Sequence, residues 1–292
     1  MMKGNKIPAK LLLAGEFTVL TGGEALGIPF PKFFGQWAYG KTVDERLENL
    51  FQYLASKKID FLDIESFLKD INSGLLFESN IPEGYGLGGS GALSAAVLQE
   101  YGLNATSDIK LIQQQLAMIE SCFHGTSSGF DPLISYFQRG CLVQNKNTRL
   151  LPETNPVYEK LVTNLYLIDS NSERINTSPI QWFYEQINSL PFQTKIEELN
   201  GINSLFIRNV LEVDQPDMSP LFQKISSLQF ELFQPLIVPT MRKIWEAGLE
   251  QGTYFCKLCG KGSGGFYYVW LNGADSEILH QDFPDLSFIS IR

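Results

Sequence analysis

Apolar positions near the start of the chain follow the pattern of extended strands. Residues 7–13, I-P-A-K-L-L-L, predict a buried strand, and A-G-E-F-T-V-L-T-G-G predicts a second short strand ending in a turn at Gly22 and Gly23. Residues 25–39 are apolar and aromatic with two prolines, which favours a strand followed by a loop that lines a pocket. A plain core strand explains the same residues equally well.

Helical periodicity begins after this segment. Apolar residues between positions 44 and 73 recur at helical spacing and predict two amphipathic helices. Residues 75–81 predict a strand, and Ala-, Leu- and Val-rich sequence at 92–101 predicts a buried helix. A further helix is expected over 107–123, with Ser107 as its N-cap.

The second half also alternates between strands and helices. Residues 140–151 predict a strand pair, and Pro152–Pro156 has the composition of a linker. Helical periodicity dominates from Pro179 to about residue 251, and strands are expected at 161–168, 253–258, 266–271 and 286–291. Strands that frame helices in this way predict an α+β sandwich, which we divide into domains at 1–154 and 155–292.

Composition narrows the range of functions. The chain has 292 residues, 44% of them hydrophobic, and a net charge of −9. Such a charge argues against nucleic acid or an anionic membrane as the main partner. No segment is long and apolar enough to cross a bilayer, so we expect a cytoplasmic protein. Cys256 and Cys259 are spaced C-x-x-C without a second such pair, which favours reduced thiols over a zinc or redox site.

A glycine-rich segment precedes the helix expected at 92–101. Residues 81–96 read I-P-E-G-Y-G-L-G-G-S-G-A-L-S-A-A. Glycine lets backbone N–H groups face a ligand, and the first turn of a helix adds unpaired N–H donors and partial positive charge. The combination predicts a phosphate site, although a glycine-rich turn before a core helix remains the alternative.

Three segments in order resemble the signature motifs of the GHMP small-molecule kinases, a family that includes galactokinase, homoserine kinase, mevalonate kinase and phosphomevalonate kinase. They are P-A-K-L-L-L-A-G-E-F at 8–17, G-Y-G-L-G-G-S-G-A at 84–92 and K-L-C-G-K-G-S-G-G at 257–265. The resemblance spans nearly the whole chain. A G-x-x-x-x-G-K-[ST] phosphate loop does not occur in the sequence.

The resemblance implies an N-terminal domain with a left-handed βαβ unit and a C-terminal ferredoxin-like domain. It also implies ATP between the domains. The residues that would bind ATP are Gly84, Gly86, Leu87, Gly88, Gly89, Ser90, Gly91, Ala92, Gly260, Gly262, Ser263 and Gly264.

Catalytic roles follow residue by residue from the same resemblance. The segment H-G-T-S-S-G-F-D at 124–131 is similar to H-G-x-x-S-G-x-D of mevalonate kinases, which makes Asp131 the catalytic aspartate and Lys10 its partner. Glu120 and Ser90 match the ligands of Mg²⁺. An aspartate that orients the attacking hydroxyl and a metal that bridges the phosphates are what phosphoryl transfer needs.

Contacts to the acceptor are expected from Glu16, Phe17, His124 and Ser128. The chain departs from the family pattern in three places. Gly89 replaces a serine, Phe17 replaces the histidine of G-E-H, and Lys261 and Ser263 stand where glycine and alanine are common.

These features predict an ATP- and Mg²⁺-dependent kinase of a small hydroxy acid, with mevalonate as the first choice and phosphomevalonate or a sugar as alternatives. In the segment 28–41, which we expect to line the acceptor site, only Lys32 and Lys41 are basic. A phosphorylated acceptor would need more positive charge, so this count slightly favours an unphosphorylated acid. A phosphorylating decarboxylase is disfavoured because its serine-rich second motif is missing, and a non-catalytic nucleotide-binding protein because the expected polar residues are present. The sequence is also compatible with a homodimer.

Overall fold

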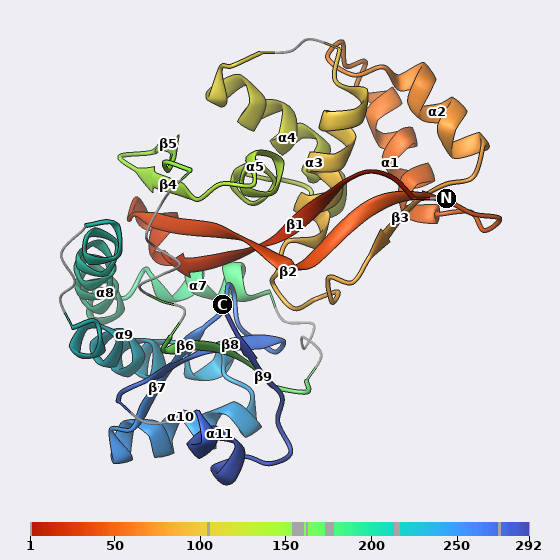
Figure 1. The fold of residues 1–292 in the computed structure, drawn as a ribbon. Helices are drawn as coiled ribbons and strands as arrows, with labels where there is room; N and C mark the ends of the chain where they lie inside the picture. Colours follow the sequence, from red (N-terminus) through yellow and green to blue (C-terminus); the bar gives the residue numbers. More distant parts are fainter. Residues whose placement is uncertain are drawn as a thin grey trace.

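The chain folds into two antiparallel sheets, one in each half, with helices packed around them (Figure 1). This computed structural model describes residues 2–103, 106–153, 161, 163–172, 178–212, 217–273 and 276–291. Helices of the N-terminal half lie on one side of the first sheet, and the C-terminal half lies on the other side (Figure 1). The mixture of helices and antiparallel sheets confirms the predicted α+β class.

A long hairpin of two strands organises the first sheet. The strands are β1 (Met2–Ala14), β2 (Ala25–Tyr39), β3 (Leu75–Ser79), β4 (Cys141–Gln144) and β5 (Asn147–Leu150). Their order is β1-β2-β4-β5, and β3 also pairs with β2. Both β3 and β4 run antiparallel to β2, so they are parallel to each other and the chain must cross over between them. The handedness of this crossover stays a prediction.

Five helices cover the first sheet. They are α1 (Glu45–Ser56), α2 (Ile64–Asn72), α3 (Gly89–Tyr101), α4 (Ile109–His124) and α5 (Phe130–Phe137). Helix α3 is buried along most of its length and begins inside the glycine-rich segment, earlier than predicted. The prediction of Ser107 as N-cap of α4 was wrong. Asp108 takes that role, because its carboxylate accepts hydrogen bonds from the N–H groups of Lys110 and Leu111.

The segment after β1 does not form the predicted second strand. It forms a turn and a 3₁₀ helix, η1 (Thr18–Thr21), which ends at Gly22 in the left-handed region. Phe17 has a φ of +62° and a buried side chain. The apolar residues of this segment bury one side of a tight turn. A short strand with one buried face would show the same alternation, and for this reason the sequence pattern predicted a strand.

The second sheet has the strand succession of a ferredoxin-like fold. Its strands are β6 (Leu165–Asp169), β7 (Tyr254–Leu258), β8 (Phe266–Leu271) and β9 (Phe288–Ser290), in the order β7-β8-β6-β9. The helical elements are α7 (Pro179–Gln186), α8 (Leu190–Leu211), α9 (Ser219–Leu232), η2 (Gln234–Leu236), α10 (Pro239–Gln251) and α11 (Glu277–Asp282). With α11, which the sequence pattern did not predict, the half has the β-α-β-β-α-β order.

Buried apolar side chains from both halves form one continuous cluster. The segment 25–39 is a single strand throughout, and β2 therefore contributes no separate loop to a pocket. The predicted boundary between 154 and 155 lies outside the described residues, so the division into two domains stays a prediction.

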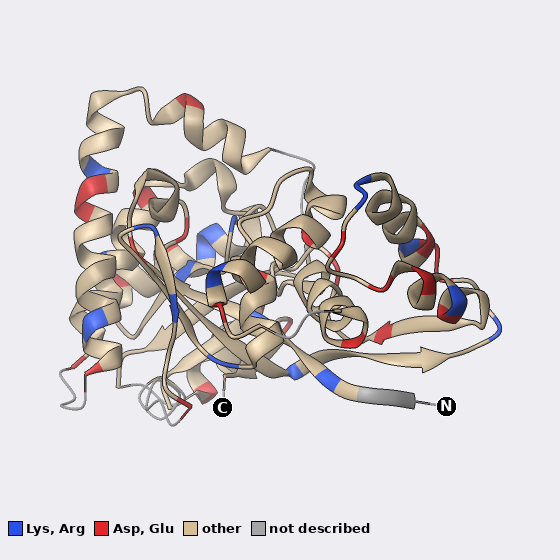
Figure 2. Cartoon of the chain, turned by 90° about the horizontal axis from the view of Figure 1, so that it is seen from above, with Lys and Arg blue, Asp and Glu red and all other residues tan. Residues whose placement is uncertain are grey.

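Charged residues are distributed over many elements. In Figure 2 the Lys and Arg positions of the described chain lie among Asp and Glu positions. Within the described part of the chain, no helix combines the length and the apolar character that a membrane crossing requires.

Candidate active site

A buried lysine and an aspartate lie in contact in the wall of a large cavity. Lys10 lies in the middle of β1 and is 4% exposed. Its Nζ is 2.8 Å from Oδ2 of Asp131, whose side chain is 35% exposed. Asp131 lies in the first turn of α5, after Gly129, which has a φ of +71°. The sheet and the start of a helix therefore hold the two predicted catalytic residues together.

The cavity has a volume of about 770 Å³ and runs along the hairpin between the two halves. Its wall includes the predicted residues Lys10, Glu16, Phe17, Gly84, Gly86, Leu87, Gly88, Gly89, Ser90, His124, Asp131 and Gly260. Apolar side chains of Leu12, Val19, Leu20, Phe123 and Ile180 complete the part near η1. A mostly apolar cleft with a few converging polar groups is typical of a small-molecule site.

The glycine-rich segment is fixed against β1. The N–H of Lys10 donates to the carbonyl of Leu87 over 2.9 Å. Gly88 precedes α3 in the left-handed region, and a Cβ at this position would lie 2.9 Å from Cγ of Lys10. Because only glycine fits here, the backbone can pass directly beside Lys10. The N-terminus of α3 then faces the cavity at Gly89 and Ser90.

Glu120 lies beside this helix start. It projects from α4, is 5% exposed, and accepts hydrogen bonds from Oγ of Ser90 (3.3 Å) and from Oγ of Ser127. Burial and the nearby Asp131 carboxylate raise the pKa of Glu120 to about 7. A buried carboxylate whose proton affinity is raised by a neighbouring negative charge favours a cation beside it.

The residues therefore fit a Mg²⁺ ion. Glu120 and Ser90 supply hard oxygen donors at one end of the phosphate loop, and Mg²⁺ commonly takes only one or two protein ligands besides phosphates and water. Among the described residues no three His, Cys, Asp or Glu side chains form a metal-binding group of their own. Cys256 and Cys259 are buried free thiols in the second sheet.

His124 lies beside Ser90 in the same part of the site. Its Nε2 lies 2.9 Å from Oγ of Ser90, and it lines the cavity with Lys261. Burial, followed by the positive charge of Lys261, lowers the pKa of His124. The ring is thus placed beside the phosphate loop.

Glu16 forms an ion pair with another residue of the protein. Its Oε1 is paired with Nζ of Lys257, and both residues are almost fully buried. Glu16 also lines the cavity, and its buried Oε2 has no hydrogen-bond partner among the described residues. Phe17, the next residue, packs its ring against Phe183 and Phe233, with centroids 5.3 and 4.8 Å away. Glu16 is therefore held by its ion pair with Lys257, and Phe17 by aromatic packing.

The third glycine-rich segment contributes less of the cavity wall than expected. Gly260 and Lys261 line it, whereas Gly262, Ser263 and Gly264 do not. The N–H of Ser263 donates to the carbonyl of Leu236 over 2.7 Å, and a Cβ on Gly262 would lie 2.8 Å from the same oxygen. These residues hold the loop against η2.

Four other predicted positions also lie off the cavity. Gly91 and Ala92 are buried inside α3, where Gly91 lets α5 approach: a Cβ there would lie 3.0 Å from the nitrogen of Pro132. The hydroxyl of Ser128 accepts from the N–H of Phe130 over 3.3 Å at the start of α5. Neither these three residues nor Glu120 lines the cavity, and the same holds for the acceptor segment expected at 28–41.

Sequence reasoning assigned no site role to four side chains of this region. Ser127, Lys257 and Lys261 all stand inside quoted motifs, but only the fold shows that Ser127 rather than Ser128 contacts Glu120 and that Lys257 pairs with Glu16. Arg46, which lines the far end of the cavity, lies outside every motif. The two lysines used for charge counting are elsewhere: Lys32 donates to the carbonyl of Ser290, and Lys41 is exposed outside the cavity wall.

Comparison with known proteins agrees with this geometry. Residues 49–139 match the family model of the GHMP kinases N terminal domain. The chain is similar to crystal structures of mevalonate kinase from Methanococcus jannaschii (17% identity, TM-score 0.68, covering 99% of this chain and 97% of that one) and phosphomevalonate kinase from Streptococcus pneumoniae (16%, 0.64, 99% and 98%). Galactokinase from Lactococcus lactis, complexed with galactose, is also similar (12%, 0.62, 98% and 92%).

No curated protein matches the chain in sequence. The family evidence is therefore the match of the N-terminal segment together with a fold shared over nearly the full length. The chain therefore contains a segment that matches the GHMP kinases N terminal domain, and over nearly its full length it has the fold of the GHMP kinase structures.

Proposed function

We propose that the chain is an ATP- and Mg²⁺-dependent kinase that phosphorylates a hydroxyl group of a small acid, with mevalonate as the first acceptor to test. The observation that carries this proposal is the 2.8 Å contact between Lys10 and Asp131, in the same cavity as the glycine-rich loop and the start of α3. A base, a cation and a phosphate cradle thus face one space.

The chain's own residues have distinct tasks. Asp131 accepts a hydrogen bond from the acceptor hydroxyl and orients its oxygen toward the terminal phosphorus of ATP. It takes the proton as the new P–O bond forms and the bond from that phosphorus to the bridging oxygen breaks, with ADP as the leaving group. Lys10 holds the aspartate and adds positive charge where negative charge develops. Since Lys10 is buried and fixed by β1, this charge needs no rearrangement during the reaction.

Glu120 and Ser90 would hold Mg²⁺. When bound, the ion would neutralise negative charge on the phosphates. Ser127 keeps one oxygen of Glu120 in place, and His124 does the same for the hydroxyl of Ser90.

Lys261 supports a phosphorylated acceptor, phosphomevalonate, as the second candidate. Lys32 and Lys41 do not line the cavity, so the count of basic residues now rests on Lys10, Arg46 and Lys261, which do. Lys261 lies on the wall near His124 and brings a cation that the family pattern does not predict. A phosphate needs such extra positive charge more than a carboxylate does.

A screen of ADP release decides among these acceptors. The full chain is incubated with ATP, Mg²⁺ and a panel of small hydroxy acids, their phosphates and sugars, with Asp131→Asn as the control. We expect ADP release dependent on mevalonate. A kcat/KM at least tenfold higher for phosphomevalonate would select the second candidate, and ATP binding without turnover on any acceptor would favour a non-catalytic nucleotide-binding protein.

A further inference from the structure

The cavity extends past the reacting residues to β3, where Arg46 forms part of its wall. Arg46 lies in the first turn of α1 and shares the cavity with Lys10, Asp131 and the loop at 84–90. We propose that the flat face of the Arg46 guanidinium is a stacking platform for the base of the nucleoside triphosphate. The proposal rests on the proposed kinase function and identifies a residue that determines nucleotide specificity.

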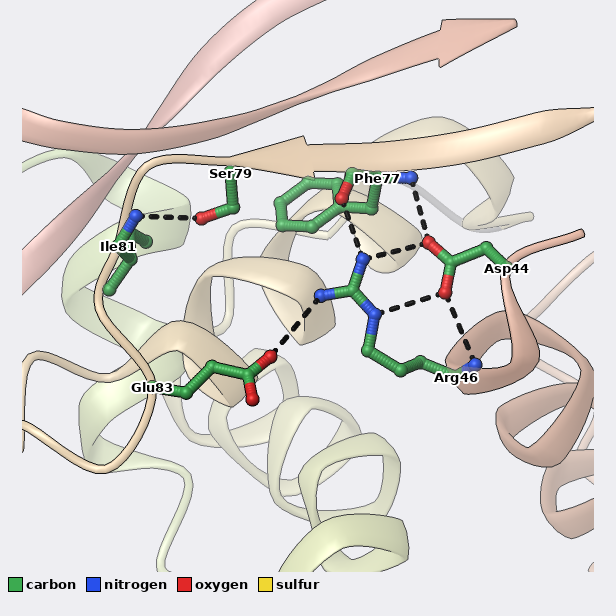
Figure 3. A network of polar contacts seen from close by, with 6 residues as sticks. All are labelled: Asp44, Arg46, Phe77, Ser79, Ile81 and Glu83. Atoms are coloured by element: carbon green, nitrogen blue, oxygen red, sulfur yellow. Dashed lines mark hydrogen bonds and ion pairs between the residues drawn. The ribbon is translucent and has the colours of Figure 1, made fainter. Parts of the chain in front are cut away.

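The guanidinium is held in one plane by its neighbours (Figure 3). Nε and Nη2 donate to the two carboxylate oxygens of Asp44 over 3.0 and 2.8 Å, and Nη2 also donates to the carbonyl of Phe77 over 2.8 Å. Asp44 is fixed in turn, because it accepts from the N–H groups of Arg46 and Phe77 over 3.1 and 3.2 Å. A side chain ordered in advance loses little entropy on binding.

The edge of the guanidinium is therefore largely occupied, and a ligand in the cavity would meet its face. Nη1 points toward the carboxylate of Glu83, 3.9 Å away, on the remaining side (Figure 3). The side chain of Arg46 is nevertheless 46% exposed. An arginine with engaged donors and an open face binds planar rings by stacking, as nucleobases do on guanidinium planes.

Local charge argues against a phosphate at this place. Asp44, Arg46 and Glu83 together carry a formal charge of −1, so an anion here would meet two carboxylates. The phosphates have a better site at the start of α3, beside Lys10. A neutral aromatic group suits the Arg46 end.

The path between the two ends fits one extended nucleotide. Ile81, Pro82 and Glu83 line the cavity and lead from β3 directly into the glycine-rich loop. At the beginning of this path, Oγ of Ser79 accepts from the N–H of Ile81 over 3.0 Å, which leaves its O–H to donate to a ring nitrogen. The two fused rings of a purine cover more of the platform than a single pyrimidine ring, so we expect ATP to bind better than CTP.

Equilibrium binding to the full chain tests the platform without requiring turnover. ATP, CTP and inorganic tripolyphosphate are titrated with Mg²⁺ into the unmodified chain, Arg46→Ala and Arg46→Lys. We expect the unmodified chain to prefer ATP over CTP by tenfold or more, about 1.4 kcal/mol. Both variants should lose most of this preference and bind tripolyphosphate unchanged, because lysine keeps the charge but not the plane.

The matched control is Arg139→Lys. Arg139 also donates to a main-chain carbonyl, that of Leu151 over 3.0 Å, but it lies outside the cavity wall. Thermal unfolding checks each variant, and Arg46→Lys decides the question if the loss of the Asp44 partner unfolds Arg46→Ala.

Three results would overturn the inference. If Arg46→Lys folds and keeps the preference for ATP, the platform lies elsewhere and the kinase proposal stands. If tripolyphosphate binding weakens as much as ATP binding, Arg46 is a phosphate ligand. If the unmodified chain binds neither nucleotide nor tripolyphosphate, the kinase proposal itself fails.

Discussion

Glu16 and Lys257 form a buried ion pair between residues 241 positions apart, joining the turn after β1 to β7. Nζ of Lys257 also donates to the carbonyl of Leu258 over 3.0 Å and lies 4.4 Å from the ring centroid of Tyr268. Burial raises the pKa of Glu16, against the lowering effect of Lys257. The pair therefore connects the first and third glycine-containing motifs across the two halves.

Replacing only one residue of this ion pair should destabilise the protein more than replacing both. We expect Lys257→Met to lower the free energy of unfolding by about 3–5 kcal/mol, since it leaves Glu16 buried and uncompensated. Adding Glu16→Gln should recover part of the loss. Denaturant unfolding of the two single variants and the double variant measures the coupling, and strictly additive losses would contradict it.

Asp131→Asn should abolish turnover and leave ATP affinity nearly unchanged. Asparagine keeps the size of the side chain but cannot accept the proton of the acceptor hydroxyl. Steady-state kinetics and ATP titration together separate the two effects. A variant that retains most of the kcat would place the base elsewhere.

Lys10→Met should lower kcat by about tenfold or more with a smaller effect on ATP binding. The change removes a charge that faces Asp131 but keeps an apolar stem of similar length beside Gly88. The same two measurements apply. An effect on ATP affinity alone would assign Lys10 to the phosphate site.

Binding of Mg²⁺ should depend on pH through Glu120. Because its pKa is raised from 4.5 to about 7, a proton competes with the metal below pH 7, and the Mg²⁺ concentration for half-maximal rate should fall as pH rises from about 5.5 to 7. Glu120→Gln and Ser90→Ala should both raise that concentration. Glu120→Gln should in addition remove this pH dependence, and an unchanged profile would show that another group titrates.

The raised pKa of Glu120 should also make the stability of the metal-free protein depend on pH. The folded chain holds a proton on Glu120 that the unfolded chain releases above pH 4.5, so this group lowers stability progressively as pH rises from 4.5 to about 7. Thermal unfolding of Glu120→Gln should lack this contribution.

The cysteine pair should be dispensable for activity. Cys256 and Cys259 are buried free thiols, and burial raises the pKa of both, which disfavours the thiolate that zinc requires. Cys256→Ser combined with Cys259→Ser should keep kcat and contain no zinc, at a stability cost of about 1–3 kcal/mol for buried hydroxyls. Zinc bound in stoichiometric amount to the unmodified chain would contradict this expectation.

The local pattern of apolar and polar residues in the sequence was enough to predict most helices and strands and the order of the motifs. Helical periodicity located α1 and α2, and the abrupt change from glycine to alanine and leucine located α3, because these signals depend on neighbouring residues. It failed at η1, where a turn buries alternating residues as a strand would. The motifs also named Lys10 and Asp131, which the structure places in contact.

Only the tertiary structure decided which side chains reach the cavity. Ser127 and Ser128 are neighbours in a single motif, yet only Ser127 contacts Glu120. Lys32 and Arg46 carry the same charge, but strand pairing turns Lys32 toward Ser290 while α1 brings Arg46 to the wall. Such outcomes depend on contacts between distant segments, which no local spacing encodes.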